Sequence, residues 1–106
     1  GELTYDTLFP KEAKATLADA CKSRLHAHDA DEALSKAQVA EMMSPDYAKS
    51  ILTAVGNLAA WTFNTDGARV HFSPYELAPY AAGSFECRLP LDLLRDLSTA
   101  GQHLPQ

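Results

Sequence analysis

The chain has 106 residues, of which 46% are hydrophobic and 22% are charged, and its formal net charge is −5 at pH 7. This length suits one globular domain with a single core and argues against two domains. The acidic balance, without a lysine and arginine cluster, argues against nucleic-acid binding, and no apolar run approaches the roughly 18 residues of a transmembrane helix.

The first predicted helix begins near Pro10, because the missing N–H of proline is tolerated at the first helical position. Apolar or small residues then recur at steps of three and four, which predicts an amphipathic helix with one face in the core. These residues are Ala13, Leu17, Ala20, Cys21 and Leu25. The pattern is lost over the polar residues 26–32, which we interpret as the helix end and an exposed linker.

Two shorter helices are predicted in the middle of the chain. Ser35 followed by Gln38 is a capping-box pattern, which indicates a helix over about residues 36–43. Ser44 as N-cap and Pro45 as first helical residue then predict a second helix, which Gly56 should end. The apolar side of this second helix is expected to hold Tyr47, Ile51, Leu52 and Val55.

A β-hairpin is predicted around Asp66-Gly67, a pair typical of two-residue type I′ turns. In that register Phe63 pairs with Val70, and Trp61 pairs with Phe72. All four side chains then lie on one face of the hairpin, because side chains alternate along a strand. The opposite face is polar and includes His71, which we expect at the surface without a partner.

A third strand is predicted over residues 84–89, with Phe85, Cys87 and Leu89 facing inward and Glu86 and Arg88 facing outward. Pro90 has no N–H to donate and should end the ladder, and leucines at 91, 94 and 97 predict a short amphipathic helix. The fold class is therefore α+β. We expect a long N-terminal helix and short helices packed on a small antiparallel sheet of about three strands, with a short C-terminal helix.

Both cysteines are predicted to face the interface between the first helix and the sheet. Cys21 lies on the apolar stripe of the helix, and Cys87 lies on the inner face of the third strand. A disulfide between them is geometrically conceivable, but two separate buried thiols fit the same pattern, since free cysteine is among the most buried residue types.

An ordered connection is predicted over residues 72–83, between the hairpin and the third strand. Pro74 and Pro79 each fix their own φ and disfavour helical geometry at the preceding residue. Tyr75, Glu76 and Tyr80 stand on this braced loop and are our candidate binding residues, because a stiff loop loses little entropy when it binds. The two tyrosines could instead pack at the edge of the core and hold the loop to the sheet.

The same loop carries a resemblance to a known family. Its two Pro-Tyr pairs, followed by Ala-Ala-Gly, resemble the central motif of a bacterial domain family of unknown function. Further matching segments lie at 3–9, 61–63, 66–67, 89–91 and Leu94. The family forms the C-terminal part of RsiV, a lysozyme-sensing anti-sigma factor, and of PdaC-like peptidoglycan deacetylases. The resemblance implies that residues 1–106 are one domain of a longer exported protein, preceded by a companion domain and located outside the cytoplasm, in the periplasm or at the cell surface.

No compact catalytic motif of a serine hydrolase, zinc protease or P-loop nucleotidase is present, so we expect no enzymatic activity and no cofactor. The deacetylases that the chain resembles keep their catalytic residues in a separate domain. Two histidines and two aspartates lie within residues 26–31, but positions 26 and 28 point in different directions on a helix. We therefore predict no metal site there.

The resemblance implies a non-catalytic recognition domain that binds a protein, with lysozyme-like muramidases as the leading partner class, in a sensor or an inhibitor. The negative charge suits a basic partner, because complementary charges speed encounter. Two alternatives stay open: an accessory module that binds cell-wall glycan, and a purely structural or interaction domain, for example one that dimerises through a sheet edge. Exposed Tyr75, Glu76 and Tyr80 would favour binding, and buried ones would favour a structural role.

Overall fold

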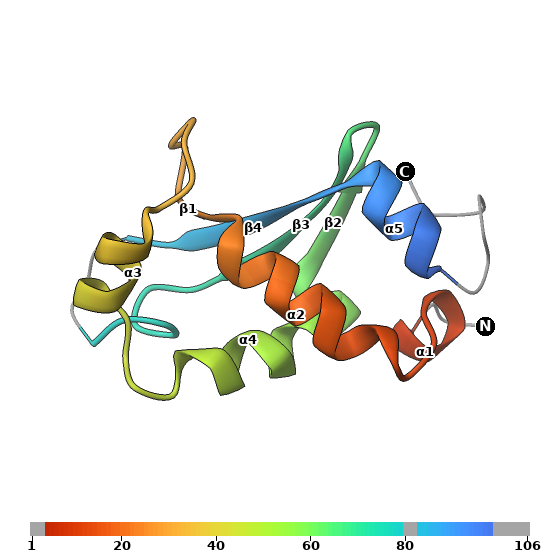
Figure 1. Ribbon diagram of the computed structural model, residues 1–106, viewed down its shortest axis with the longest axis horizontal. Helices are drawn as coiled ribbons and strands as arrows, with labels where there is room; N and C mark the ends of the chain where they lie inside the picture. The colour runs from red at the N-terminus through yellow and green to blue at the C-terminus, as the bar shows by residue number, and fades with distance from the viewer. Residues whose placement is uncertain (1–3, 80–82, 99–106) are drawn as a thin grey trace.

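The computed structural model describes residues 4–79 and 83–98 (Figure 1). Its elements in chain order are α1 (Tyr5–Leu8), α2 (Ala13–Ser23), β1 (Leu25–Ala27), α3 (Lys36–Met42), α4 (Tyr47–Val55), the 3-10 helix η1 (Leu58–Ala60), β2 (Trp61–Asn64), β3 (Gly67–Phe72), β4 (Phe85–Pro90) and α5 (Leu91–Leu97). The predicted α+β class is confirmed.

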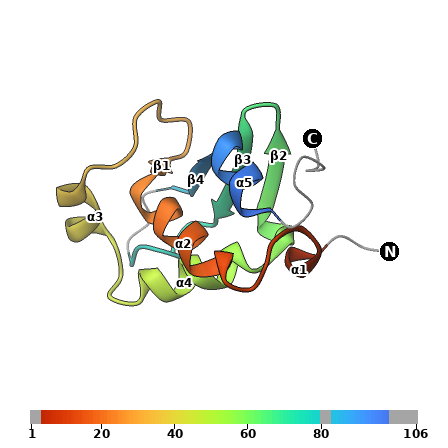
Figure 2. The same cartoon turned by 45° about the vertical axis from the view of Figure 1, so that its right-hand side comes forward.

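The sheet has four strands in the order β1-β4-β3-β2, and every neighbouring pair is antiparallel. Helices α2 and α4 cover one face, while the 28–34 loop rises from the opposite face (Figures 1 and 2). The inner face is apolar and the outer face is polar, as expected of an antiparallel sheet covered on one side.

The core lies between the two helices and the inner face of the sheet. Leu17 and Cys21 of α2 and Ile51 and Val55 of α4 are fully buried there. Cys21 and Cys87 form a disulfide with their Cα atoms 5.1 Å apart, which ties α2 to β4. The sequence was compatible with either a disulfide or two separate buried thiols, and the structure has the disulfide.

Strand β1 corrects the expectation that residues 26–32 are a helix end and an exposed linker. Leu25, His26 and Ala27 pair with Cys87, Glu86 and Phe85 of β4. A three-residue strand is too short to show alternation in its sequence. It forms because β4 offers an unpaired edge of backbone N–H and C=O groups that must find partners.

The hairpin register differs from the prediction by two residues. Trp61 pairs with Val70, and the two-residue loop is Thr65-Asp66 rather than Asp66-Gly67. Because the shift is even, the predicted inner and outer faces are preserved. The side-chain amide oxygen of Asn64 accepts a hydrogen bond from the Asp66 N–H at 2.8 Å, which forms the turn one position earlier.

The starts of two helices also differ from the prediction. Helix α2 begins at Ala13, one turn after Pro10, because the Ala13 N–H donates to the Pro10 carbonyl in a preceding turn. Helix α4 begins at Tyr47 with Asp46 as N-cap, whereas the Ser44 N–H donates to the Leu77 carbonyl 2.8 Å away. Ser44 thus anchors a distant loop instead of capping the helix.

The remaining local predictions have mixed outcomes. The capping box of α3 is confirmed, since the Gln38 N–H donates to the Ser35 hydroxyl and the Ser35 N–H donates to the Gln38 side chain. Gly56 ends α4 as predicted. Leu52, in contrast, is 40% exposed and lies outside the core.

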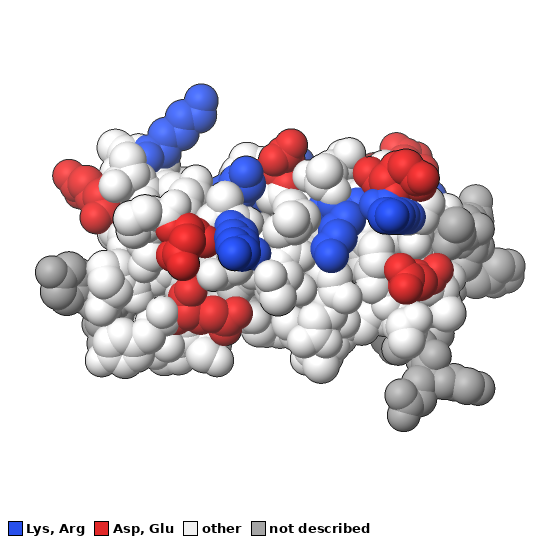
Figure 3. Space-filling view, turned by 90° about the horizontal axis from the view of Figure 1, so that it is seen from below, with Lys and Arg blue, Asp and Glu red and all other residues white. Residues whose placement is uncertain are grey.

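Charged side chains of both signs are interspersed over the helix-covered face (Figure 3). No helix within residues 4–79 and 83–98 is long and apolar enough to span a bilayer.

Candidate functional site

The connection after β3 begins with a tight turn over residues 73–76, which we call the Tyr75 turn. The Glu76 N–H donates to the Ser73 carbonyl at 3.1 Å, which closes a four-residue β-turn. Pro74 occupies its second position and Tyr75 its third, where φ is +71°. Turns with positive φ at the third position normally carry glycine or asparagine there, because a Cβ is strained in that conformation.

The side chain of Glu76 closes the same turn a second time. Its Oε1 accepts a hydrogen bond from the Ser73 N–H at 3.0 Å. The two hydrogen bonds run in opposite directions between the same two residues, and the proline ring fixes φ between them. The turn is therefore held in shape by its own atoms.

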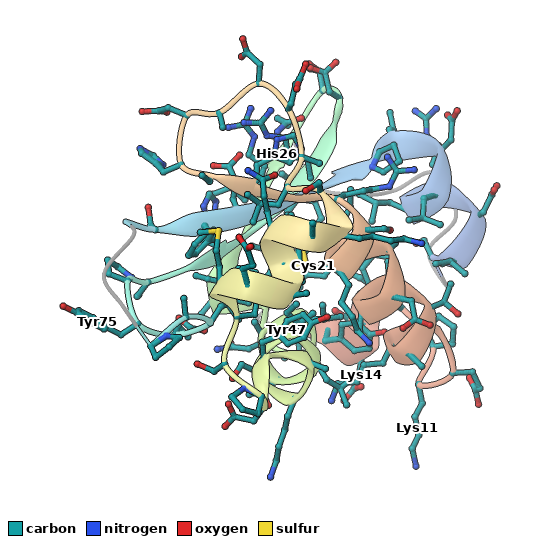
Figure 4. The ribbon with its side chains drawn as sticks, turned by 60° about the vertical axis from the view of Figure 1, so that its left-hand side comes forward. Lys11, Lys14, Cys21, His26, Tyr47 and Tyr75 are labelled. Carbon is teal, nitrogen blue, oxygen red and sulfur yellow. A yellow bond between two sulfur atoms is a disulfide. The ribbon has the colours of Figure 1, made fainter. Side chains whose placement is uncertain are left out.

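Tyr75 projects from this turn away from the body of the protein (Figure 4). It is 65% exposed, whereas Leu77 and Ala78, directly behind the turn, are 0% and 2% exposed. The Leu77 carbonyl also accepts the hydrogen bond from Ser44. An exposed aromatic ring thus stands on a base that is fixed in the core.

The other two candidate binding residues are Glu76 and Tyr80, of which the structure describes only Glu76. Glu76 is exposed, as the binding interpretation requires. Tyr80 lies outside the described residues. The exposure of Tyr75 means that it does not fasten the loop to the sheet, and buried Leu77 and Ala78 fill that structural role instead.

Two hollows border the Tyr75 turn. One, of about 300 Å³, contains Glu76 together with residues of α4 and its N-cap. Its lining residues are Asp46, Lys49, Ser50, Thr53 and Glu76. The other, of about 290 Å³, contains Ser73 and Pro74 beside His28 and His71. A larger hollow of about 550 Å³ between α2, α3 and α4 contains none of the predicted site residues.

A buried carboxylate that the sequence did not predict lies on the outer face of the sheet. Glu86 is 3% exposed, and its Oε2 lies 3.0 Å from Nη1 of Arg69 and 2.9 Å from Nε of Arg88. The 28–34 loop is tied to this group, because Nη2 of Arg88 also donates to the Ala30 carbonyl at 2.8 Å. Strand alternation placed Glu86 and Arg88 together on this face, but only the sheet order brings Arg69 beside them.

The pKa of Glu86 reflects two opposed effects. Burial, the largest single influence, raises the pKa because it disfavours the charged form. The hydrogen bond from Arg88 and the charges of Arg69, Arg88 and His71 lower it, and together they outweigh burial. The pKa of Glu86 is therefore below its usual 4.5, and the carboxylate is ionised at neutral pH.

His71 has a partner, contrary to expectation, since its Nε2 lies 2.6 Å from the Thr62 hydroxyl. His26 is buried in β1, where its Nδ1 lies 3.2 Å from the Ala30 carbonyl oxygen. Over the ranges 4–79 and 83–98, no three histidine, cysteine, aspartate or glutamate side chains are grouped so as to hold a metal ion.

Comparison with known families gives one result for this chain. A family model described as "Protein of unknown function (DUF3298)" matches residues 6–92, which extend from α1 into α5 and include the Tyr75 turn. No curated protein matches the chain.

Proposed function

Since the chain belongs to the DUF3298 family, whose description names no activity, we propose a function from the geometry: a non-catalytic recognition domain that binds a protein partner through the Tyr75 turn. The observation that carries the proposal is Tyr75 itself, 65% exposed at a position of positive φ. Residues held in strained backbone conformations cluster at functional sites. Tyrosine also supplies a large contact area with few rotatable bonds.

The architecture of the turn favours tight binding. Its two hydrogen bonds between Ser73 and Glu76 and its fixed proline keep the loop in one shape before binding. Little conformational entropy is then lost when a partner orders the loop. The hollow that Glu76 lines with residues of α4 gives a partner side chain a place beside the turn.

We further propose that the domain works outside the cytoplasm. The Cys21–Cys87 disulfide supports this, because structural disulfides persist mainly in oxidising compartments. The resemblance to domains of envelope proteins supports the same location.

A basic, lysozyme-like muramidase is the leading partner class in this proposal. The resemblance to the lysozyme sensor supports it, and the net charge of −5 suits a basic partner. Such enzymes place two carboxylates about a cleft. A rigid turn with an exposed tyrosine at its tip has a shape suited to entering a cleft of this kind.

The alternatives have weaker support. Trp61 is 6% exposed, and its indole N–H donates to the Val55 carbonyl, so it is not available to stack on a sugar ring. Dimerisation through a sheet edge would use β1 or β2, which have three and four residues. Edge strands this short offer little backbone for pairing.

Calorimetric titration with a panel of lysozymes, at low and moderate salt, tests the proposal. Wild-type protein is expected to bind at least one basic lysozyme, with affinity that falls as salt rises. Tyr75→Ala should lose at least about tenfold in affinity, as removal of a binding hot spot does. Arg95→Ala is the surface control, because Arg95 lies on α5 at the other end of the sheet from the Tyr75 turn. This variant should bind the lysozyme as wild type does.

Loss of binding in Tyr75→Ala counts only if the variant remains folded, which circular dichroism establishes. Equal binding by wild type and folded Tyr75→Ala would exclude the turn as the contact. No heat with any lysozyme would exclude this partner class, and titration with glycan fragments would then test the accessory-module alternative.

A further inference from the structure

A second candidate site lies at the other end of the sheet from the Tyr75 turn. Strands β3 and β4 run antiparallel, so Phe72 and Phe85 are at the end near the turn and Gly67 and Pro90 are at the far end. At the far end a hollow of about 340 Å³ contains three arginines, from β3, β4 and the junction of α2 with β1. The lining residues are Arg24, Asn64, Asp66, Ala68, Arg69, Arg88, Leu89 and Pro90.

Buried Glu86 holds two of these arginines in place. Arg69 and Arg88 both contact its Oε2, at 3.0 and 2.9 Å, and the second guanidinium is fixed further by the Ala30 carbonyl. Their side chains remain 45% and 30% exposed, so both arginines are partly in contact with solvent while they pair with the carboxylate. Charged groups that are positioned before a ligand arrives lose little entropy when they bind it.

Arg24 supplies a third guanidinium that is not neutralised. It is exposed, and it forms no ion pair with any residue in the described part of the chain. Its backbone is fixed beside β4, because its carbonyl accepts the Arg88 N–H at 3.2 Å. With three guanidinium groups against the carboxylates of Glu86 and Asp66, the hollow is positive within a chain whose net charge is −5.

We propose that this hollow, the arginine hollow, binds an oxyanion, either a carboxylate or a phosphate group. Guanidinium groups donate paired N–H groups in a planar fork that matches the oxygens of both anions. Each arginine offers five donors, of which the contacts above use one from Arg69 and two from Arg88. Asp66 also lines the hollow, and its carboxylate repels anions. The groups that hold the oxyanion are therefore the three arginines.

The arginine hollow is independent of the function proposed for the Tyr75 turn. Neither Tyr75 nor Glu76 lines it, and none of its lining residues belongs to residues 73–76. Oxyanion binding and partner binding can therefore fail or succeed separately.

A ¹H–¹⁵N NMR titration of the whole chain tests this proposal, with inorganic phosphate and sodium acetate as separate probes at constant ionic strength. We expect saturable shifts of the Ala68 and Leu89 amide signals and of the arginine Nε–H signals, with a dissociation constant of about 1 mM or below for at least one probe. The tighter probe identifies the oxyanion.

Arg24→Ala removes the unpaired guanidinium without touching Glu86, and it should weaken the tighter probe about tenfold, as loss of a charged hydrogen bond does. Arg24→Lys, which keeps the charge but loses the fork, should fall between wild type and Arg24→Ala. Arg95→Ala removes the same charge from an exposed position on α5 and should bind like wild type. Shifts that never saturate for either probe, or an equal loss in Arg95→Ala, would overturn the proposal.

Discussion

At the scale of single residues, Tyr75 is the position where local preference and observed geometry disagree most. A φ of +71° is favourable for glycine and strained for a side chain with a Cβ. The turn would form more easily with glycine at this position. A tyrosine at this position is explained if its ring, which is 65% exposed, binds a partner and does not stabilise the fold.

We expect Tyr75→Gly to have opposite effects on stability and on binding. Relief of the strained φ should leave the free energy of unfolding unchanged or raise it by up to about 1 kcal/mol, since the exposed ring contributes little packing. Partner binding should fall as it does in Tyr75→Ala. Urea unfolding of both variants measures the first effect, and a clear loss of stability in Tyr75→Gly would assign the ring a structural role.

Glu86 is predicted to control part of the acid sensitivity of the fold. Its pKa is lower in the folded chain than the usual 4.5, so its carboxylate stabilises the fold above that pH. The stabilisation is lost as pH falls below about 4.5 and through the lower pKa of the folded state. Because Arg69 and Arg88 are partly exposed, we expect Glu86→Gln to cost about 2 kcal/mol at pH 7, below the usual cost of breaking a buried pair.

Urea unfolding at pH 7 and pH 3 measures this effect. The difference between wild type and Glu86→Gln should be large at pH 7 and smaller at pH 3, because protonation of the carboxylate below pH 4.5 removes its stabilising contribution progressively. Equal differences at the two pH values would contradict the assigned role of the carboxylate.

At the scale of elements, the β2–β3 hairpin depends on Gly67. Its φ is +144°, and a Cβ at this position would overlap the backbone at the end of β4, where the Leu89 carbonyl lies. The Leu91 N–H also donates to the Asp66 carbonyl at 3.0 Å, so the hairpin loop and the start of α5 are joined directly.

Gly67→Ala is therefore expected to lower the free energy of unfolding by about 2 kcal/mol or more, through strain at φ and displacement of β4. Gly83 also has a positive φ, of +83°, but a Cβ there would meet nothing within 4 Å, so Gly83→Ala is the matched control. A Gly67→Ala cost no larger than that of Gly83→Ala would contradict the close approach.

The elements that the sequence predicted well are those whose signals are local. The capping box of α3 needs only Ser35 and Gln38, and the inward positions of Phe85 and Cys87 follow from alternation. Strand β1 and the two-residue shift of the hairpin depend instead on pairing with a neighbouring strand, β4 for β1 and β3 for β2. Such tertiary contacts decide between local options that the sequence leaves nearly equal.

Of the two candidate sites, one could be recognised from local sequence and the other could not. The proline-flanked turn and its tyrosine could be recognised in the sequence, because proline acts on its own neighbours. The grouping of Arg24, Arg69 and Arg88 could not, because these residues come together only through the order of the strands. The alternation of β4 placed Glu86 outward, but its ion pair with Arg69 and the contact of Arg88 with Ala30 join segments that are distant in the sequence.

At the scale of the whole molecule, the Cys21–Cys87 disulfide joins the two layers of the fold. The two cysteines are 66 residues apart in sequence, and the bond closes that loop in the unfolded chain as well. In the chain-entropy model a loop of this length stabilises the fold by about 4 kcal/mol.

Replacement of both cysteines by alanine should therefore lower the free energy of unfolding by about 4 kcal/mol. The double variant leaves no free thiol that could pair with another chain. Urea unfolding of the double variant beside wild type, with and without a reducing agent, measures the effect. A reducing agent should lower the stability of wild type alone, and no difference between the two proteins under oxidising conditions would contradict the role of the bond.

The central claim is that the Tyr75 turn is the surface that a protein partner covers. Hydrogen–deuterium exchange of the domain, with and without a basic lysozyme in excess, tests it most directly. We predict slower exchange of the backbone amides at Tyr75, Glu76 and Leu77 in the presence of the lysozyme, with the amides of α5 unchanged. Protection confined to another face, such as the hollow between α2, α3 and α4, or no protection at all, would contradict the claim.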